Sequence, residues 1–198
     1  MTVPHSDVAG FTTHQGRLAV VPGDQIDTDR IIPARFLSRI ERAGYGELLF
    51  SDVRGPEFAL DQPEAQGATI MVVGSNFGCG SSREHAVWAI QQAGFRTVIA
   101  RVEPDSPGFS DIFRQNAENC GLLLIDLSPC DHKKLVEAGS GTEATIDLPN
   151  QSIVCKGAVI DFDINPATKA SVVAGLDLIG STLQYTDAIA AYEAKVAA

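Results

Sequence analysis

The chain has 198 residues, of which 44% are hydrophobic and 20% are charged, as in an ordinary globular protein of one domain. Its 15 basic and 25 acidic residues give a net charge of −10, and no basic cluster offsets it, which disfavours nucleic acid as a partner. The apolar runs are shorter than the ~20 residues of a membrane-spanning helix, and the first residues lack a signal core. We therefore expect a cytoplasmic protein that binds neither nucleic acid nor membrane.

The cysteines are Cys79, Cys120, Cys130 and Cys155, and no two of them form a C-x-x-C pair. A chain of this length does not depend on disulfides for its stability, so the pattern favours free thiols in a reducing compartment. We expect no metal site in this chain.

The first strand is expected at residues 11–22, where an apolar run ends at Pro22 and a glycine. Three acids follow within six residues. They could be metal ligands, but Asp and Thr side chains also bond to their own backbone in turns, and we favour a turn. The apolar residues after them fit either a core or a patch against an aliphatic ligand. Residues 38–66 are polar and rich in Gly and Pro, which predicts loops and short helical turns.

The most informative stretch is Gly74–His85, which lies between an expected strand at 68–73 and an expected helix that ends at Gly94. Gly78 and Gly80 would allow positive φ angles and let the backbone approach a ligand closely. The first amides of a helix have no partner within the helix, so such a loop suits an anion.

Arg83 adds a bidentate donor to this loop, which favours a carboxylate or a phosphate as the ligand. The loop lacks the Lys of a nucleotide P-loop, and Arg83 stands where a dinucleotide fingerprint has its third glycine. A simpler interpretation is also open. Ser81 and Glu84 have the spacing of a capping box, in which both side chains only satisfy backbone donors at the start of the helix.

The remaining sequence alternates between strand and helix patterns and then becomes rich in strands. Strands are expected at 96–101, 122–127, 144–148, 153–155 and 159–162, and helices at 107–119, 129–138, 167–174 and 186–196. This mixed order argues against a simple doubly wound sheet. We expect an α/β fold in a single compact layered domain.

Four blocks of sequence carry a resemblance to a known family. They are Asp27–Leu37, Asn76–Ala86, Asp111–Asn116 and Gly175–Leu183. Their order across the chain resembles that of the small subunits of bacterial isopropylmalate dehydratases, and the second block is shared by the wider aconitase superfamily. The resemblance implies that residues 1–198 form one swivelling β/β/α domain of the aconitase type with a C-terminal helical extension. It also implies a separate large subunit that carries a [4Fe–4S] cluster, so that this chain itself binds none.

The resemblance implies a hydro-lyase that is active only with its large subunit and that works in leucine biosynthesis. In that family 2-isopropylmalate loses water to give isopropylmaleate, which is rehydrated to 3-isopropylmalate. The cluster iron of the large subunit would act as a Lewis acid on the dicarboxylate substrate.

The motif positions imply roles for individual residues. By position in the motif, Ser81 is the catalytic base, and Ser82 and Arg83 bind a substrate carboxylate. Phe36 and Leu37 are candidates for contacting the isopropyl group. Arg39 is the candidate for a second carboxylate-binding cation, with Arg35 as its competitor. The residues expected to support the loop are Gly78, Cys79, Gly80, Glu84 and His85.

Other functions fit the same residues. One is a related hydro-lyase subunit that acts on methylmalate, citraconate or dimethylmaleate-type diacids, because an apolar pocket separates such substrates by only ~1–3 kcal/mol per methylene. Another is a binding or regulatory module without turnover. A third is a thiol enzyme, in which a helix N-terminus lowers the pKa of Cys79 and His85 is the base.

Overall fold

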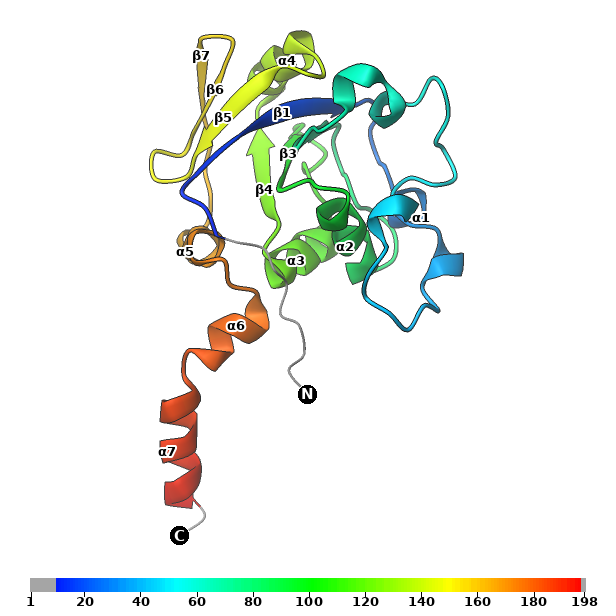
Figure 1. Ribbon diagram of the computed structural model, residues 1–198. Coiled ribbons are helices and arrows are strands. Elements are labelled where there is room, and N and C mark those ends of the chain that lie inside the picture. The colour runs from blue at the N-terminus through cyan, green and yellow to red at the C-terminus, as the bar shows by residue number, and fades with distance from the viewer. Residues whose placement is uncertain (1–9, 197–198) are drawn as a thin grey trace.

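A computed structural model describes residues 10–196 of the chain (Figure 1). Seven strands form one curled sheet in the order β4-β3-β2-β1-β5-β6-β7. The strands are β1 (Thr13–Val21), β2 (Ile70–Val73), β3 (Thr97–Arg101), β4 (Leu123–Leu127), β5 (Glu143–Asp147), β6 (Ser152–Cys155) and β7 (Ala158–Asp161). The α/β class and the three strands expected between residues 144 and 162 are therefore confirmed.

The long first strand joins a parallel half of the sheet to an antiparallel half. Its second part, from Leu18 to Val21, pairs in parallel with β2, while its first part, from Thr13 to Arg17, pairs antiparallel with β5. The strands β2, β3 and β4 continue the parallel half, and β5, β6 and β7 form an antiparallel meander. One nine-residue strand thus belongs to both halves.

Helices cover both faces of the parallel half. The helices are α1 (Thr28–Ile31), α2 (Glu84–Gln92), α3 (Asp111–Cys120), α4 (Pro129–Ala138), α5 (Pro166–Ala174), α6 (Leu178–Leu183) and α7 (Thr186–Val196). Short 3-10 turns lie between α1 and β2, at Ala34–Phe36, Gly46–Leu48, Ala59–Asp61 and Pro63–Ala65. The expected loops and short helical turns of residues 38–66 are confirmed.

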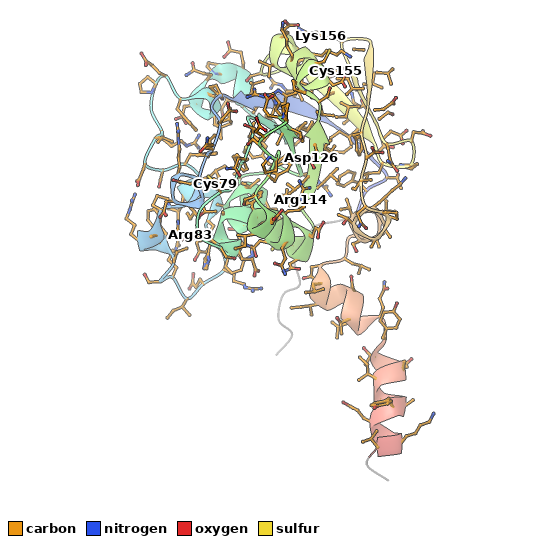
Figure 2. The ribbon with its side chains drawn as sticks, turned by 180° about the vertical axis from the view of Figure 1, so that it is seen from behind. Cys79, Arg83, Arg114, Asp126, Cys155 and Lys156 are labelled. Atoms are coloured by element: carbon orange, nitrogen blue, oxygen red, sulfur yellow. The ribbon has the colours of Figure 1, made fainter. Side chains whose placement is uncertain are left out.

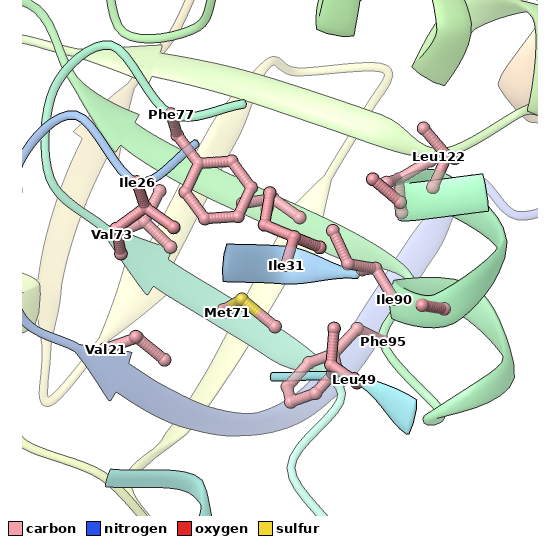
Figure 3. Close-up of a cluster of buried hydrophobic side chains, with 14 of the residues drawn as sticks. Val21, Ile26, Ile31, Leu49, Met71, Val73, Phe77, Ile90, Phe95 and Leu122 are labelled. Atoms are coloured by element: carbon pink, nitrogen blue, oxygen red, sulfur yellow. The ribbon is translucent and has the colours of Figure 1, made fainter. Parts of the chain in front are cut away.

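The core follows from the alternation of side chains along the strands. On β2, Met71 and Val73 enter the cluster that α1, α2 and α3 cover, while Ile70 and Val72 enter the cluster on the opposite face. A parallel strand that is buried on both faces is expected to be apolar throughout. Figure 3 shows Met71 and Val73 on β2 in the cluster that α1, α2 and α3 cover, together with Phe77 of the same cluster.

Two helix predictions for the second half of the chain are wrong. The helix expected from residue 107 begins at Asp111, where Ser110 caps it, because residues 107–109 are extended along the glycine loop. The helix α6 was not expected at all. It begins after Asp177, whose side chain accepts a hydrogen bond from the amide of Gly180.

The helices α6 and α7 leave the body as an arm (Figure 1), which we call the C-terminal arm (residues 178–196). None of its residues is buried. Its large apolar side chains are exposed at Leu178, Ile179, Leu183, Tyr185, Ile189, Tyr192 and Val196. Between residues 10 and 196, the helices lack the combination of length and apolar character needed to cross a membrane.

Candidate functional site

The glycine loop (residues 74–83) connects β2 to α2 at the edge of the sheet where the parallel strands end. It lies between two extended segments that follow β1 and β3. On one side, the amide of Gly78 donates to Ile26 O (2.8 Å), and the amide of Thr28 donates to Cys79 O (2.9 Å). On the other side, the amide of Phe77 donates to Gly108 O (2.9 Å). Loops that meet at this edge form the usual ligand site of α/β sheets.

The two central glycines have the predicted positive φ angles, 74° at Gly78 and 91° at Gly80. They differ in what surrounds them. A Cβ on Gly78 would lie 2.3 Å from Phe113 Cγ, whereas a Cβ on Gly80 would meet nothing closer than 3.6 Å. Asn76 also has a positive φ, of 52°, which Asn tolerates better than most residues. The loop therefore depends on Gly78 for space and on Gly80 for its backbone angle alone.

The capping-box prediction for Ser81 is wrong. The helix α2 begins at Glu84, its N-cap is Arg83, and no side chain caps it. The chain before Arg83 is instead held to the β1–α1 segment, where the amide of Thr28 donates to Cys79 O at 2.9 Å. The Thr28 hydroxyl donates to Ser81 O at 2.8 Å. Ser81 is consequently exposed in the loop, with a side chain that plays no part in starting the helix.

Ser82 is also exposed, and its hydroxyl accepts a hydrogen bond from Asn116 Nδ2 at 3.2 Å. Asn116 belongs to α3 and is 34 positions away in the sequence. It is a neighbour of the loop that we did not predict, although it ends one of the blocks that carried the family resemblance.

Arg83 lies almost buried beside Asp29. Its side chain is 10% exposed, and its Nη1 is 2.6 Å from Asp29 Oδ1, which is an ion-pair distance. Within the described residues this buried atom makes no hydrogen bond, so its contact with Asp29 counts as an ion pair alone. We conclude that the contact is mainly electrostatic and that the guanidinium retains a donor for another acceptor.

Glu84 and His85 contact the protein around the first turn of α2. Glu84 Oε1 accepts from Trp88 Nε1 at 3.1 Å and from Cys120 Sγ at 3.6 Å. The ring of His85 packs on Tyr45 and Trp88, with centroid distances of 5.4 and 4.5 Å. Burial lowers the pKa of His85. Such contacts are typical of residues that stabilise the fold. That Glu84 and His85 support the glycine loop stays a prediction.

The chemistry of Cys79 disfavours the thiol-enzyme alternative. Its Sγ donates to Gln25 O at 3.4 Å. Burial, followed by the charge of Asp27, raises the pKa of this thiol, which is opposite to the lowering that a nucleophile needs. All four cysteines are free thiols, as predicted.

The three acids after β1 each have a separate partner. Asp24 Oδ1 accepts from the amide of Ser75 (2.8 Å), Asp27 Oδ1 accepts from the amide of Arg30 (2.7 Å), and Asp29 pairs with Arg83. The predicted turn is thus the helix cap of α1. Within residues 10–196 there is no group of three or more His, Cys, Asp and Glu side chains placed to hold a metal ion.

The candidates for substrate recognition lie after α1. Phe36 is half-buried against the core below α2, and Leu37 is half-buried beside it. Arg35 is exposed and pairs with Asp52, with Nη1 2.8 Å from Oδ2. Arg39 is exposed over the ring of Tyr45, 5.5 Å from its centroid. Figure 2 shows Cys79 and Arg83 on the flank of the body that lies away from the C-terminal arm.

Known proteins resemble this chain over almost its full length. The aconitase C-terminal domain family matches residues 8–129, and the LeuD_N family matches residues 134–166. The 3-isopropylmalate dehydratase small subunit of Acidothermus cellulolyticus is 46% identical over 189 residues, which are 93% of each chain. That of Shouchella clausii is 45% identical and covers 93% of this chain and 95% of its own.

A crystal structure of 3-isopropylmalate dehydratase from Methanocaldococcus jannaschii has the same fold, with a TM-score of 0.67 and 30% identity. The match covers 91% of this chain and 99% of that one. The α/β architecture with its curled seven-stranded sheet is accordingly that of the aconitase C-terminal swivel domain. The chain belongs to the family of 3-isopropylmalate dehydratase small subunits within the aconitase superfamily.

Proposed function

We propose that this chain is the small subunit of a hydro-lyase that converts 2-isopropylmalate to 3-isopropylmalate through isopropylmaleate, in leucine biosynthesis. The observation that carries the proposal is that one glycine loop presents both an exposed Ser81 and, two residues on, a nearly buried Arg83. The family membership supports the same reaction. We further propose that residues 1–198 act as one swivel domain with a helical extension and work in the cytoplasm.

Ser81 is the proposed base. The proton that must leave lies on a carbon next to a carboxylate and is weakly acidic, so a base has to be held against it. The electrons of that C–H bond would form the double bond as the neighbouring C–O bond breaks, so that the proton taken up by Ser81 and the released hydroxide together account for the water that is lost. A neutral serine is a poor base, so Ser81 has to be ionised, and the loop amides and Arg83 would stabilise its oxyanion.

Arg83 and Ser82 are the proposed ligands of one substrate carboxylate. Arg83 is nearly buried and ion-paired with Asp29, which holds its guanidinium at the loop. A guanidinium has five N–H donors, so it can also bind a carboxylate with two parallel bonds. Gly78 and Gly80 let the loop backbone come close to the same group.

The second cation in our proposal is Arg39. Arg35 already makes a two-bond contact with Asp52, whereas Arg39 makes one long hydrogen bond, from Nη1 to Gly44 O at 3.4 Å. Arg39 therefore loses less when it turns toward a carboxylate. Phe36 and Leu37 would form an apolar wall for the isopropyl group.

The partner in our proposal is a large subunit that carries a [4Fe–4S] cluster. Thiolates hold such clusters, and the cysteines of this chain do not fit one, because Cys120 and Cys155 are buried in separate core clusters and Cys130 is exposed on α4. The C-terminal arm supports a protein partner. An isolated 11-residue helix is marginal in water, and within the described residues no side chain of α7 is buried, so its exposed apolar side chains would be covered in an assembly.

The experiment is co-expression with the large subunit encoded in the same genome, followed by hydratase assays on isopropylmaleate, citraconate and dimethylmaleate. We expect the assembled pair to prefer isopropylmaleate. A preference for either of the other diacids would support the related hydro-lyase instead. An assembled, cluster-loaded pair without turnover on any of them would support the non-catalytic module.

The role of Ser81 as the base is tested by Ser81→Ala. This variant should assemble with the large subunit and lose ~10²–10⁴-fold in kcat, and full turnover would refute the role.

A further inference from the structure

The backbone of the recognition loop (residues 36–45) is hydrogen-bonded to the side chain of Gln92, at the end of α2. Gln92 Nε2 donates to Arg42 O at 2.7 Å, and Gln92 Oε1 accepts from the amide of Tyr45 at 2.8 Å. The amide group therefore uses both of its functions on backbone groups three residues apart. The Gln92 side chain thus satisfies backbone hydrogen-bonding groups of the loop that would otherwise pair with a strand or a turn.

Tyr45 extends this attachment to the other end of the loop. It is fully buried, and its ring packs against Trp88, with a centroid distance of 5.7 Å. Its hydroxyl donates to Phe36 O at 3.4 Å, and its ring lies under the guanidinium of Arg39. The residue held by Gln92 thus contacts both the start of the loop and its candidate cation.

The chain that follows Tyr45 lies directly on the end of α2. A Cβ on Gly46 would be 2.5 Å from the carbonyl carbon of Gln92, so no larger residue fits there without a shift of the backbone. Arg42 also contacts α2, with its guanidinium over the ring of Trp88, 4.5 Å from the centroid. Arg42 Nη2 is 3.7 Å from Glu84 Oε1, but the Arg42 side chain is 64% exposed, and exposed ion pairs contribute little.

We propose that Gln92 is a positioning residue that sets the recognition loop relative to Arg83 and so determines the affinity for the alkyl end of the substrate. The inference rests on the proposed function. Gln92 ends the helix that Arg83 begins, so one rigid element carries both the carboxylate donor and the loop anchor. A loop that is held in its bound shape before the substrate arrives costs less entropy on binding.

The test uses Gln92→Leu, with Gln91→Leu as the matched control. Gln91 lies on the same helix, but its amide donates to Cys120 O at 2.8 Å and not to the recognition loop. In the assembled enzyme we expect Gln92→Leu to raise KM for isopropylmaleate about 3- to 10-fold with kcat within twofold, since a hydrogen bond contributes ~0.5–1.5 kcal/mol. The preference for isopropylmaleate over citraconate should fall as well. Gln91→Leu should change neither.

A physical measurement separates this inference from the proposed function. Amide hydrogen exchange in residues 36–45 should be faster in Gln92→Leu than in Gln91→Leu, whatever the substrate. If loop exchange increases but KM is unchanged, the positioning role is refuted. The same holds if both variants raise KM equally, or if kcat alone falls. Gln92→Glu keeps the acceptor for Tyr45 and the size of the side chain, and it should give an intermediate KM if the leucine variant does not fold.

Discussion

Arg83 Nη1 and Asp29 Oδ1 are 2.6 Å apart, so that the arginine of the glycine loop is held by an acid from the β1–α1 segment. This contact orients the guanidinium before a substrate binds. We predict that Arg83→Lys raises KM and lowers kcat/KM by about 10- to 100-fold, because a lysine cannot form two parallel bonds to a carboxylate. Steady-state kinetics of the assembled enzyme measure this.

Arg54→Lys is the matched control for that variant. Arg54 also pairs with an acid, Asp61, at 2.8 Å, but it lies in the long connection before β2. Its kinetics should match those of the unmodified protein. Equal substrate affinity in Arg83→Lys and Arg54→Lys would exclude the bidentate carboxylate contact.

Gly78→Ala should destabilise the protein by about 2–5 kcal/mol. The φ of 74° costs an L-residue ~1–2 kcal/mol, and the new Cβ would collide with Phe113, for which overpacking adds ~1–3 kcal/mol. Gly67→Ala separates the two effects, because Gly67 has a similar φ of 72° and open space around its Cβ position. Denaturant unfolding should show the larger loss for Gly78→Ala, and equal losses would mean that Phe113 moves aside at no cost.

Most strands and helices could be predicted because their signals are local. The apolar run that became β2 and the Ser128-Pro129 start of α4 need no information from the rest of the chain. The pairing of β1 with both halves of the sheet could not be predicted, since it depends on partners more than 50 positions away. The start of α3 was misplaced for a related reason, as Pro107 resembles a first helical residue but lies in the segment paired with the glycine loop.

The candidate site was predicted in part. The motif placed Ser81 and Arg83 on one loop, and the positive φ angles of Gly78 and Gly80 followed from residue type. The capping box failed because a tertiary hydrogen bond from Thr28 holds the chain before α2. The pairs of Arg83 with Asp29 and of Ser82 with Asn116 join segments that are distant in the sequence, so no local pattern reveals them.

The pH dependence of stability should depend on His132. This residue of α4 is 4% exposed, and its Nε2 lies 2.7 Å from Val73 O. Burial lowers its pKa in the folded state below the 6.5 of the unfolded chain. As pH falls below about 6.5, the unfolded state takes up the proton first, so the free energy of unfolding should decrease.

His132→Gln retains a donor for Val73 O without a titrating group. We expect its free energy of unfolding, measured in denaturant between pH 8 and pH 5, to change less with pH than that of the unmodified protein. A remaining slope is expected, because burial also lowers the pKa of His14 and of His85. Identical slopes in the two proteins would show that His132 is protonated in the folded state without cost.

The last prediction concerns the C-terminal arm and the large subunit. Leu183 and Tyr192 are 51% and 69% exposed, and in the assembly we expect them to be buried against the partner. The double variant Leu183→Ser, Tyr192→Ser should bind the large subunit at least 10-fold more weakly, because each buried anchor of an interface contributes ~1–2 kcal/mol or more.

Val159→Ser is the control for the double variant, since Val159 is 64% exposed on β7 in the antiparallel half of the sheet. Titration of the large subunit with each variant gives the affinities, and thermal unfolding of the isolated small subunits should be the same for all. An unchanged affinity in the double variant would mean that the arm does not contact the large subunit, and the exposed apolar side chains would then need another partner.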